Sequence, residues 1–340
     1  MRIGIVVSEP GASARVRALQ HVPAWQSRGA EVRWLAWSAP AGRPAVARRS
    51  AEVLALAGWA DVVMLQKPVS PPALVRALRA TNRRLVVDLD DATWVGGRSR
   101  VVEPARLKRV AATVAAAQAV VVGSEHLGNM LTGVMPVASQ LHVLRPAVEV
   151  PDVPPAGDRM ARRPVVAGWI GSPQNLADFQ PTVLEALGSL VRRDVLTVRI
   201  ISTAGFASDV ALPHELVPWT ERGEAAAVAE VDVGLMPLAD DLRSRGRCGY
   251  KAIQMMAAGV PVIASPVGCS VELVGGGRGL LASSVEQWSD ALSLLASQPD
   301  QRRAHGDRGH AWVAAEASAP VVGAHLLDIL CDVARAPRWG

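Results

Sequence analysis

The clearest signature of architecture in this chain reads DVGLMPL from Asp232, SRGRCGYKAIQ from Ser244 and MMAAGVPVIASPVG from Met255. The apolar residues before Pro237 are typical of a short buried strand, and a second buried strand is expected from Val260. A loop rich in glycine and arginine and a helix over 249–258 separate the two strands. This order of elements is typical of parallel strands joined by a helical crossover.

The same alternation of short β-branched runs with longer amphipathic segments extends over the whole chain. In the first half we expect a helix at 13–28 and strands at 2–7, 32–37, 62–65, 85–88 and 119–122. In the second half we expect strands at 165–170, 196–201, 231–235, 260–264 and 279–281, and helices at 178–191, 249–258, 285–296 and 320–335. Both halves are therefore predicted to be α/β, doubly wound, Rossmann-like domains.

A break rich in proline separates the two halves at residues 151–164. We interpret this segment as a linker between an N-terminal domain at 1–150 and a C-terminal domain at 165–317. A final helix within 318–340 is expected to pack back on the first domain. Ligands of such sheets bind beyond the carboxyl ends of the strands, so the site is expected in a cleft where the two domains face each other.

The composition excludes several classes of protein. Of the 340 residues, 50% are hydrophobic and 20% are charged, a balance that is too apolar for a disordered chain. The net charge of +5 is small and contains no long block of one sign. We therefore expect no nucleic-acid partner, while peripheral contact with an anionic membrane surface is compatible with the charge.

The cysteines indicate the compartment. Cys248, Cys269 and Cys331 form no CxxC pair and no cluster with histidine, so a structural zinc site is not expected. A sparse, odd cysteine count fits a reducing environment. We expect no signal peptide, and the longest apolar stretch is too short to cross a bilayer. These observations favour a cytoplasmic location.

The loop that precedes residues 249–258 has the features of a phosphate site. Arg245, Arg247 and Lys251 supply three cations, while Gly246 and Gly249 allow the backbone to approach a ligand closely. A helix N-terminus adds free N–H groups and the positive end of the helix dipole. The alternative is a solvated loop with an ordinary helix cap.

Residues 231–275 resemble the donor-binding half of GT-B glycosyltransferases of family 4, the group 1 type. The resemblance rests on the order of Pro237, the glycine-rich loop, the AAGVPV run from Ala257, Gly268 and Glu272. The GWIGS run from Gly168 and Ser124 after a strand of the first half fit the same pattern. The resemblance implies a hexosyltransferase that takes a sugar from a UDP- or GDP-sugar and retains the anomeric configuration. Because no cluster of His, Cys and carboxylate residues accompanies the cationic loop, we expect neither a metal nor another cofactor.

The resemblance also implies a set of donor-binding residues. Two glutamates that the family places seven residues apart are replaced here by Gly246 and Gln254; the amide of Gln254 can still bind a ribose, whereas Gly246 cannot contact the transferred sugar. Trp219 is either close to the nucleobase or a packing residue. The expected donor-binding residues are Gly171, Ser172, Trp219, Arg245, Arg247, Gly249, Lys251, Gln254 and Glu272.

The acceptor, a small molecule or a glycan, is assigned to the first half. Asp88, Asp90 and Asp91 follow a strand, and carboxylates there could bind acceptor hydroxyls, hold a divalent metal with a diphosphate, or cap the next turn. Ser13 and Arg15 follow the first strand without a GxGxxG motif, so they are either acceptor contacts or a cap with a solvated arginine. We expect acceptor binding by Ser13, Arg15, Asp88 and Asp91, and catalysis by Asp88, Asp91, Arg245 and Lys251.

Two other functions remain open at this point. One is a GT-B protein that binds a nucleotide or sugar but has lost transfer, which the replacement of both glutamates would favour. The other is a sugar-nucleotide epimerase, for which Asp88, Asp91 and Glu272 are the candidate acids and bases. Products formed from the donor alone would distinguish the epimerase from a transferase.

Overall fold

The computed structural model describes residues 1–38, 42–67, 71–97, 100–151, 164–206 and 211–336. Contacts divide the chain into two compact units. Unit 1 consists of Met1–Ala147, Asp241–Cys248 and Ala319–Gly340, and unit 2 of Val148–Asp240 and Gly249–Ser318. Each unit contains one six-stranded sheet in which every neighbouring pair of strands is parallel. The predicted fold class is confirmed.

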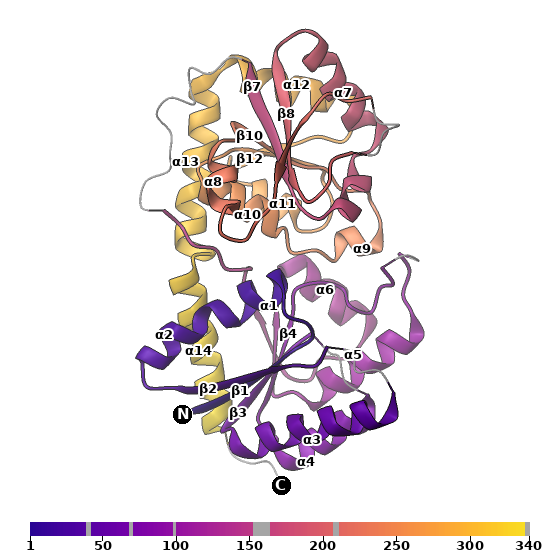
Figure 1. The fold of residues 1–340 in the computed structure, drawn as a ribbon, viewed down its shortest axis with the longest axis vertical. Helices are drawn as coiled ribbons and strands as arrows, with labels where there is room; N and C mark the ends of the chain where they lie inside the picture. Colours follow the sequence, from indigo (N-terminus) through magenta and orange to yellow (C-terminus); the bar gives the residue numbers. More distant parts are fainter. Residues whose placement is uncertain (39–41, 68–70, 98–99, 152–163, 207–210, 337–340) are drawn as a thin grey trace. The chain divides into compact units, whose positions relative to one another are not determined.

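The sheet of unit 1 has the strand order β2-β1-β3-β4-β5-β6 (Figure 1). Its central strands are buried along their whole length, as parallel strands covered on both faces must be. The edge strands are more polar and partly exposed. The strands are β1 (Arg2–Val7), β2 (Glu31–Ala36), β3 (Val62–Gln66), β4 (Leu85–Leu89), β5 (Ala119–Val122) and β6 (Gln140–Val143).

Helices cover both faces of this sheet because successive side chains of each strand point to opposite sides. On β1, Val6 joins the core beneath one set of helices, while Ile5 and Val7 join the other. The first set is α3 (Arg43–Trp59), α4 (Pro72–Thr81), α5 (Pro104–Ala116) and α6 (Glu125–Val134). The second set is α1 (Ala12–Arg17), η1 (Leu19–His21), α2 (Val22–Ser27) and α14 (Ala319–Arg335).

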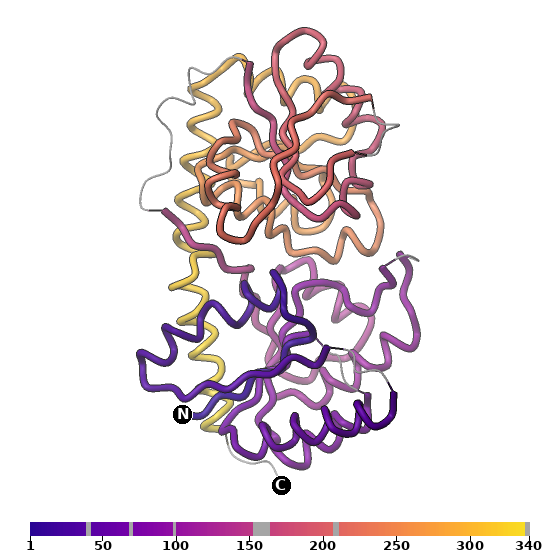
Figure 2. Tube along the Cα trace, viewed as in Figure 1, coloured from indigo at the N-terminus to yellow at the C-terminus, as the bar shows by residue number. Residues whose placement is uncertain are grey.

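The helix α14 belongs to unit 1 although it ends the chain. Figures 1 and 2 show it in yellow beside the indigo N-terminal elements. Leu326 and Leu330 are almost fully buried against the strands, and Trp25 of α2 donates a hydrogen bond of 2.8 Å from Nε1 to the carbonyl of Gly323. The apolar face of the last helix thus completes the core of the first unit.

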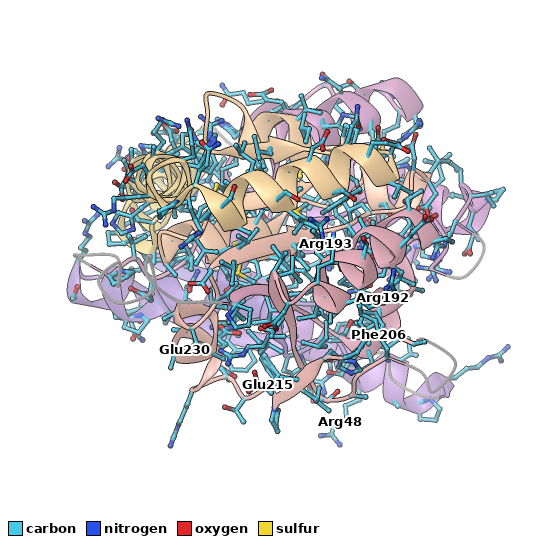
Figure 3. All side chains as sticks on the ribbon, turned by 90° about the horizontal axis from the view of Figure 1, so that it is seen from above. Arg48, Arg192, Arg193, Phe206, Glu215 and Glu230 are labelled. Carbon is cyan, nitrogen blue, oxygen red and sulfur yellow. The ribbon has the colours of Figure 1, made fainter. Side chains whose placement is uncertain are left out.

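The sheet of unit 2 has the order β12-β11-β10-β7-β8-β9, which is the Rossmann order. Its strands are β7 (Val165–Ile170), β8 (Leu196–Ser202), β9 (Glu215–Pro218), β10 (Val233–Met236), β11 (Val262–Ala264) and β12 (Gly279–Leu281). Near the β9 edge of this sheet, Arg199 of β8 donates to Glu215 Oε2 at 2.8 Å and to the carbonyl of Glu230 at 3.3 Å. Both glutamates are labelled in Figure 3.

Two sets of helices cover the unit 2 sheet. One face packs against α7 (Pro181–Arg192) and α12 (Val285–Ser297). The other packs against α8 (Glu224–Ala229), α10 (Tyr250–Ala257), α11 (Ser270–Val274) and α13 (Pro299–Glu316). A 3₁₀ turn, η3 (Pro173–Asp178), follows β7. None of the helices in the described ranges combines the length and the apolar character that a bilayer span requires.

The structure differs from the expected elements in several places. The helix expected at 13–28 is divided into α1, η1 and α2, because Pro23 has no N–H to donate to the preceding turn and the chain restarts a helix around it. The expected helix at 178–191 begins later, at Pro181, since Asp178 belongs to η3. Two short, partly polar edge strands, β6 and β9, and the helix α13 were not predicted.

Unlike the predicted domains, the two units are not continuous segments of the sequence. Residues 241–248 were expected in the second domain, but they pack with unit 1, where Cys248 is buried in the core. Residues 319–340 are part of unit 1. Most of the expected linker, residues 152–163, lies outside the described residues.

Candidate functional site

In doubly wound sheets, ligands bind where the strand order reverses, at the carboxyl ends of the strands. In unit 1 the reversal lies between β1 and β3, and in unit 2 between β7 and β10. The predicted site residues of each half follow these strands directly.

In unit 1 a buried ion pair lies at this edge. The guanidinium of Arg17 donates from Nε to both carboxylate oxygens of Asp88 at 3.1 Å, and its Nη2 also contacts Oδ1. Its Nη1 donates to the carbonyl of Leu144 at 2.6 Å. Arg17 is 3% exposed and Asp88 is 0% exposed. Burial raises the pKa of Asp88, and the charge and hydrogen bonds of Arg17 oppose that rise.

This geometry corrects the role expected for Asp88. Its carboxylate is engaged by Arg17 and has no exposed surface, so it does not reach an acceptor. We had expected it to bind the acceptor and to act in catalysis, because its place at the end of a strand is the usual place for such residues. The pair with Arg17 instead fixes α1 to the end of β4.

A second polar group, which we call the Lys67 cluster, comprises Ser13, Gln66, Lys67, Asp90 and Asp91. The hydroxyl of Ser13 donates to Asp90 Oδ2 and accepts from Gln66 Nε2 at 2.8 Å. Lys67 Nζ lies 3.0 Å from Asp90 Oδ1 and 2.8 Å from Asp91 Oδ2. Carboxylates from the end of β4 are therefore tied to α1 and to the end of β3.

Within the Lys67 cluster, Asp91 is the accessible carboxylate. Its side chain is 43% exposed, whereas that of Asp90 is 14% exposed. Burial alone would lower the pKa of Lys67, but the charges and hydrogen bonds of Asp90 and Asp91 outweigh burial and raise it. Lys67 therefore stays charged and supports an exposed carboxylate that could accept a hydrogen bond from a hydroxyl.

Sequence reasoning missed Lys67, Gln66 and Arg17. Lys67 has a φ of 62°, a left-handed backbone that is uncommon for a residue other than glycine. Such strain often concentrates at functional sites, but no sequence pattern indicates it here. Arg17 lies two residues from Arg15, the arginine that we had expected to act; Arg15 is only partly buried.

In unit 2 three of the predicted donor residues, Gly171, Gly249 and Lys251, lie at the start of α10. Gly249, the N-cap of this helix, has a left-handed φ of 68°, as the sequence pattern of a glycine before a helix suggests. Lys251 Nζ lies 4.1 Å from the ring centroid of Trp169 on β7. A Cβ on Gly171 would lie 2.4 Å from the same Nζ, so a side chain at position 171 would displace the Lys251 ammonium from its present place at the end of β7.

The remaining donor candidates of unit 2 lie on other elements or further along α10. Trp219 follows β9 and donates from Nε1 to Glu224 Oε2 at 3.1 Å. Gln254 is buried on α10, and Glu272 is partly exposed on α11. Ser172 is exposed and accepts from Asn175 at 3.0 Å. Ser202, which sequence reasoning missed, ends β8 with a buried hydroxyl that has no hydrogen-bond partner among the described residues.

Arg245 and Arg247 lie on the segment Asp241–Cys248, which belongs to unit 1, whereas Lys251 belongs to unit 2. The short helix α9 (Leu242–Arg245) is capped by Asp241, whose Oδ1 accepts from the amide of Ser244 at 2.9 Å. A Cβ on Gly246 would lie 2.3 Å from the Cβ of Ala92. A glutamate at 246 would therefore require this segment or Ala92 to move.

Metal ligation was one alternative for the aspartates after β4. Among the residues that the structure describes, no group of three or more His, Cys, Asp or Glu side chains is arranged to hold a metal ion. Asp88 faces Arg17, while Asp90 and Asp91 face Lys67. Their charges are balanced by protein cations.

A family model described as Glycosyl transferases group 1 matches residues 164–298. These residues form a group 1 glycosyltransferase domain. The match begins just before β7 and ends after α12, so it contains Gly171, Trp219, Gly249 and Lys251. The chain accordingly contains a glycosyltransferase domain, and the resemblance inferred from residues 231–275 is confirmed.

Solved structures share the GT-B fold of two Rossmann-like domains. Sucrose-phosphate synthase of Thermosynechococcus elongatus matches with a TM-score of 0.73 and 14% identity, over 98% of this chain and 99% of that chain. Anabaena HepE, in complex with UDP and glucose, matches with 0.68 and 13%, over 98% and 100%. A Rickettsia africae glycosyltransferase matches with 0.69 and 12%, over 99% of both chains. A comparison with curated proteins finds no match.

Proposed function

We propose that this glycosyltransferase moves a sugar from a nucleotide-diphosphate donor to an acceptor hydroxyl, with retention of configuration and without a metal ion. The observation that carries the proposal is Lys251 beside the left-handed Gly249 at the start of α10, where the strand order of the group 1 domain reverses. A cation and free helix N–H groups at this place suit a diphosphate.

In the proposed reaction the bond between the anomeric carbon and the donor diphosphate breaks. A bond from that carbon to the acceptor oxygen forms on the same face, and the acceptor proton passes to an oxygen of the leaving diphosphate. Lys251 would stabilise the negative charge that grows on the leaving group. Arg245 and Arg247 remain candidates for the same role, and Gln254 and Glu272 for contacts with the rest of the donor.

Unit 1 would bind the acceptor through Asp91. Its carboxylate is exposed and is held by Lys67 at 2.8 Å, so it can orient a hydroxyl without changing its own position. Ser13 and Asp90 stabilise this arrangement through their hydrogen bond. Ser13 and Arg15 stay candidate acceptor contacts.

Independence from metal is proposed because cations of the protein would do the work of a metal at the diphosphate. Transfer should then survive excess EDTA. Loss of transfer with EDTA and its recovery with Mn²⁺ would instead make Asp90 and Asp91 candidate metal ligands. A cytoplasmic location and peripheral contact with an anionic membrane are further predictions from cysteine content and charge, and do not depend on this reaction.

The donor is best identified by a thermal-shift screen of UDP, GDP and their sugar conjugates. UDP is the first candidate because HepE binds it. A true ligand raises the melting temperature by mass action. Chromatography of the products made from the bound donor, with and without simple alcohol acceptors, then tests the reaction. A new sugar nucleotide formed from the donor alone would indicate an epimerase, and binding without any turnover would indicate a protein that has lost transfer.

A further inference from the structure

The helices α4 and α5 of unit 1 carry an unusual concentration of positive charge. Residues 72–84 and 104–116 contain seven arginines and lysines and no aspartate or glutamate, whereas the whole chain has a net charge of +5. The two helices contact each other along the same face of the sheet (Figure 1). Two stretches that are separate in the sequence therefore form one basic surface, which we call the α4–α5 face.

The cations of this face point away from the core. On α4, Leu74, Val75 and Leu78 are buried, so Arg76 and Arg79, three residues apart, share the outer side, and the exposed Arg83 follows the end of the helix. On α5, Val110 and Val114 are buried. The exposed cations of the two segments are Arg76, Arg79, Arg83, Arg106, Lys108 and Arg109.

Few acidic groups compensate this charge. Arg106 pairs with Glu103 at 2.6 Å. Asp332 of α14 lines a cavity of about 710 Å³ together with Arg79 and Arg83. Arg76, Arg79, Lys108 and Arg109 make no ion pair with any residue that the structure describes. Holding several unpaired cations together costs stability through mutual repulsion, and an anionic partner would relieve that repulsion.

We propose that the α4–α5 face binds an anionic lipid surface. Exposed cations on two adjacent helices can approach phosphate headgroups together, and each adds to the attraction within a Debye length of the membrane. Single-stranded nucleic acid is the less suitable partner, because its binding surfaces combine cations with aromatic side chains that stack on bases. The α4 and α5 helices contain no aromatic residue.

Vesicle sedimentation tests the proposal with the full chain. Wild type is expected to pellet with phosphatidylcholine vesicles that contain about 30% phosphatidylglycerol and not with phosphatidylcholine alone, and to be released when NaCl rises from about 0.1 M to about 0.5 M. The variant R76Q/R79Q/K108Q/R109Q should bind the anionic vesicles at least about tenfold more weakly.

A control variant separates a local surface from net charge. R28Q/R192Q/R193Q/R303Q removes the same charge from exposed positions elsewhere, two of them at the end of α7 and labelled in Figure 3, and should bind like wild type. Equal loss in both variants, or undiminished binding of the α4–α5 variant, would overturn the proposal. So would a single-stranded oligonucleotide that binds wild type more tightly than the vesicles and displaces it from them.

These measurements are independent of sugar transfer. Vesicle binding can fail while the enzyme still transfers sugar, and the reverse is also true. Both variants should show the melting temperature of wild type within a few degrees, because the substituted side chains are exposed. A variant that melts much earlier would be replaced by the pairs R76Q/R79Q and K108Q/R109Q, each expected to lose part of the binding.

Discussion

At the scale of single residues, the candidate site depends on how each charged side chain is paired. Lys251 lies over the ring of Trp169 and close to Gly171. Asp91 has an exposed carboxylate beside Lys67, whereas the carboxylate of Asp88 is buried in an ion pair with Arg17. Residues of the same type and only three positions apart therefore lie in different environments.

The first prediction concerns Lys251. Replacing it with alanine should weaken the binding of UDP, or of whichever nucleotide diphosphate the screen identifies, by about 1–3 kcal/mol, because a charge-assisted hydrogen bond is lost. Titration calorimetry measures this change. Lys108→Ala, which removes a lysine from α5, serves as the matched control and should leave the affinity unchanged. Equal affinity of wild type and Lys251→Ala would remove Lys251 from the donor site.

The second prediction separates Asp91 from Asp88. Asp91→Asn should keep donor binding and reduce transfer by about 10²-fold, because an oriented carboxylate that acts on the acceptor is lost. Lys67→Met should reduce transfer in the same direction. Asp88→Asn should instead destabilise the fold by about 3 kcal/mol, since it leaves the buried Arg17 without its counter-charge.

Turnover, donor affinity and denaturation measured on the same preparations distinguish these outcomes. If Asp91→Asn unfolded as early as Asp88→Asn, Asp91 would be a structural residue, and the acceptor contacts would have to be sought near Ser13 and Arg15.

At the scale of elements, a buried histidine lies where α14 packs against the N-terminal helices of unit 1. His21 of η1 is 2% exposed, stacks on Trp25 with 5.7 Å between ring centroids and faces Gly323 of α14. Its Nε2 is buried without a partner among the described residues. Burial and the nearby charge of Arg17 lower its pKa to about 4. The neutral ring is therefore the form that this interface accommodates.

The third prediction follows from that pKa. A histidine with a pKa of about 4 when folded and about 6.5 when unfolded stabilises the fold fully above pH 6.5. The stabilisation is lost as the pH falls toward 4, and amounts to about 3 kcal/mol. His21→Phe should show a smaller fall in unfolding free energy between pH 7 and pH 4.5 than wild type. His325→Gln, on the exposed side of α14, should behave like wild type.

At the scale of the whole molecule, unit 1 is assembled from distant parts of the chain. Its core includes Leu326 and Leu330 from the C-terminal helix and Cys248 from a segment that interrupts unit 2. Part of the core of unit 1 is therefore covered by residues of α14. Unit 2 contains the donor candidates Gly171, Gly249 and Lys251 without any of these core residues.

The fourth prediction uses this division. Leu330→Ala should destabilise unit 1 by about 2–5 kcal/mol, because it opens a cavity where a fully buried side chain packs. Under conditions where the variant remains folded, its affinity for the nucleotide should match that of wild type. Denaturant unfolding and calorimetry test the two parts separately. A parallel loss of nucleotide affinity in the folded variant would show that the units are coupled.

Local patterns in the sequence were enough to predict two doubly wound domains and most of their strands. Short apolar runs bounded by glycine, proline and cap residues form the same element in almost any environment, as at 2–7, 119–122 and 165–170. The helix caps Gly249, before α10, and Ser124, before α6, could be predicted for the same reason. The resemblance to glycosyltransferases was inferred from one such segment, residues 231–275, which lies within the matched residues 164–298.

Only the tertiary structure decided which charges meet. Arg17 and Asp88 are 71 positions apart and Lys67 and Asp91 are 24 apart, and no local pattern distinguishes them from Arg15 and Asp90. The arginines of α4 and α5 look like scattered, solvated residues until the sheet brings the two helices together. Burial and pairing depend on side chains that approach through the fold, so the chemistry of each charge is set by neighbours that the order of residues does not reveal.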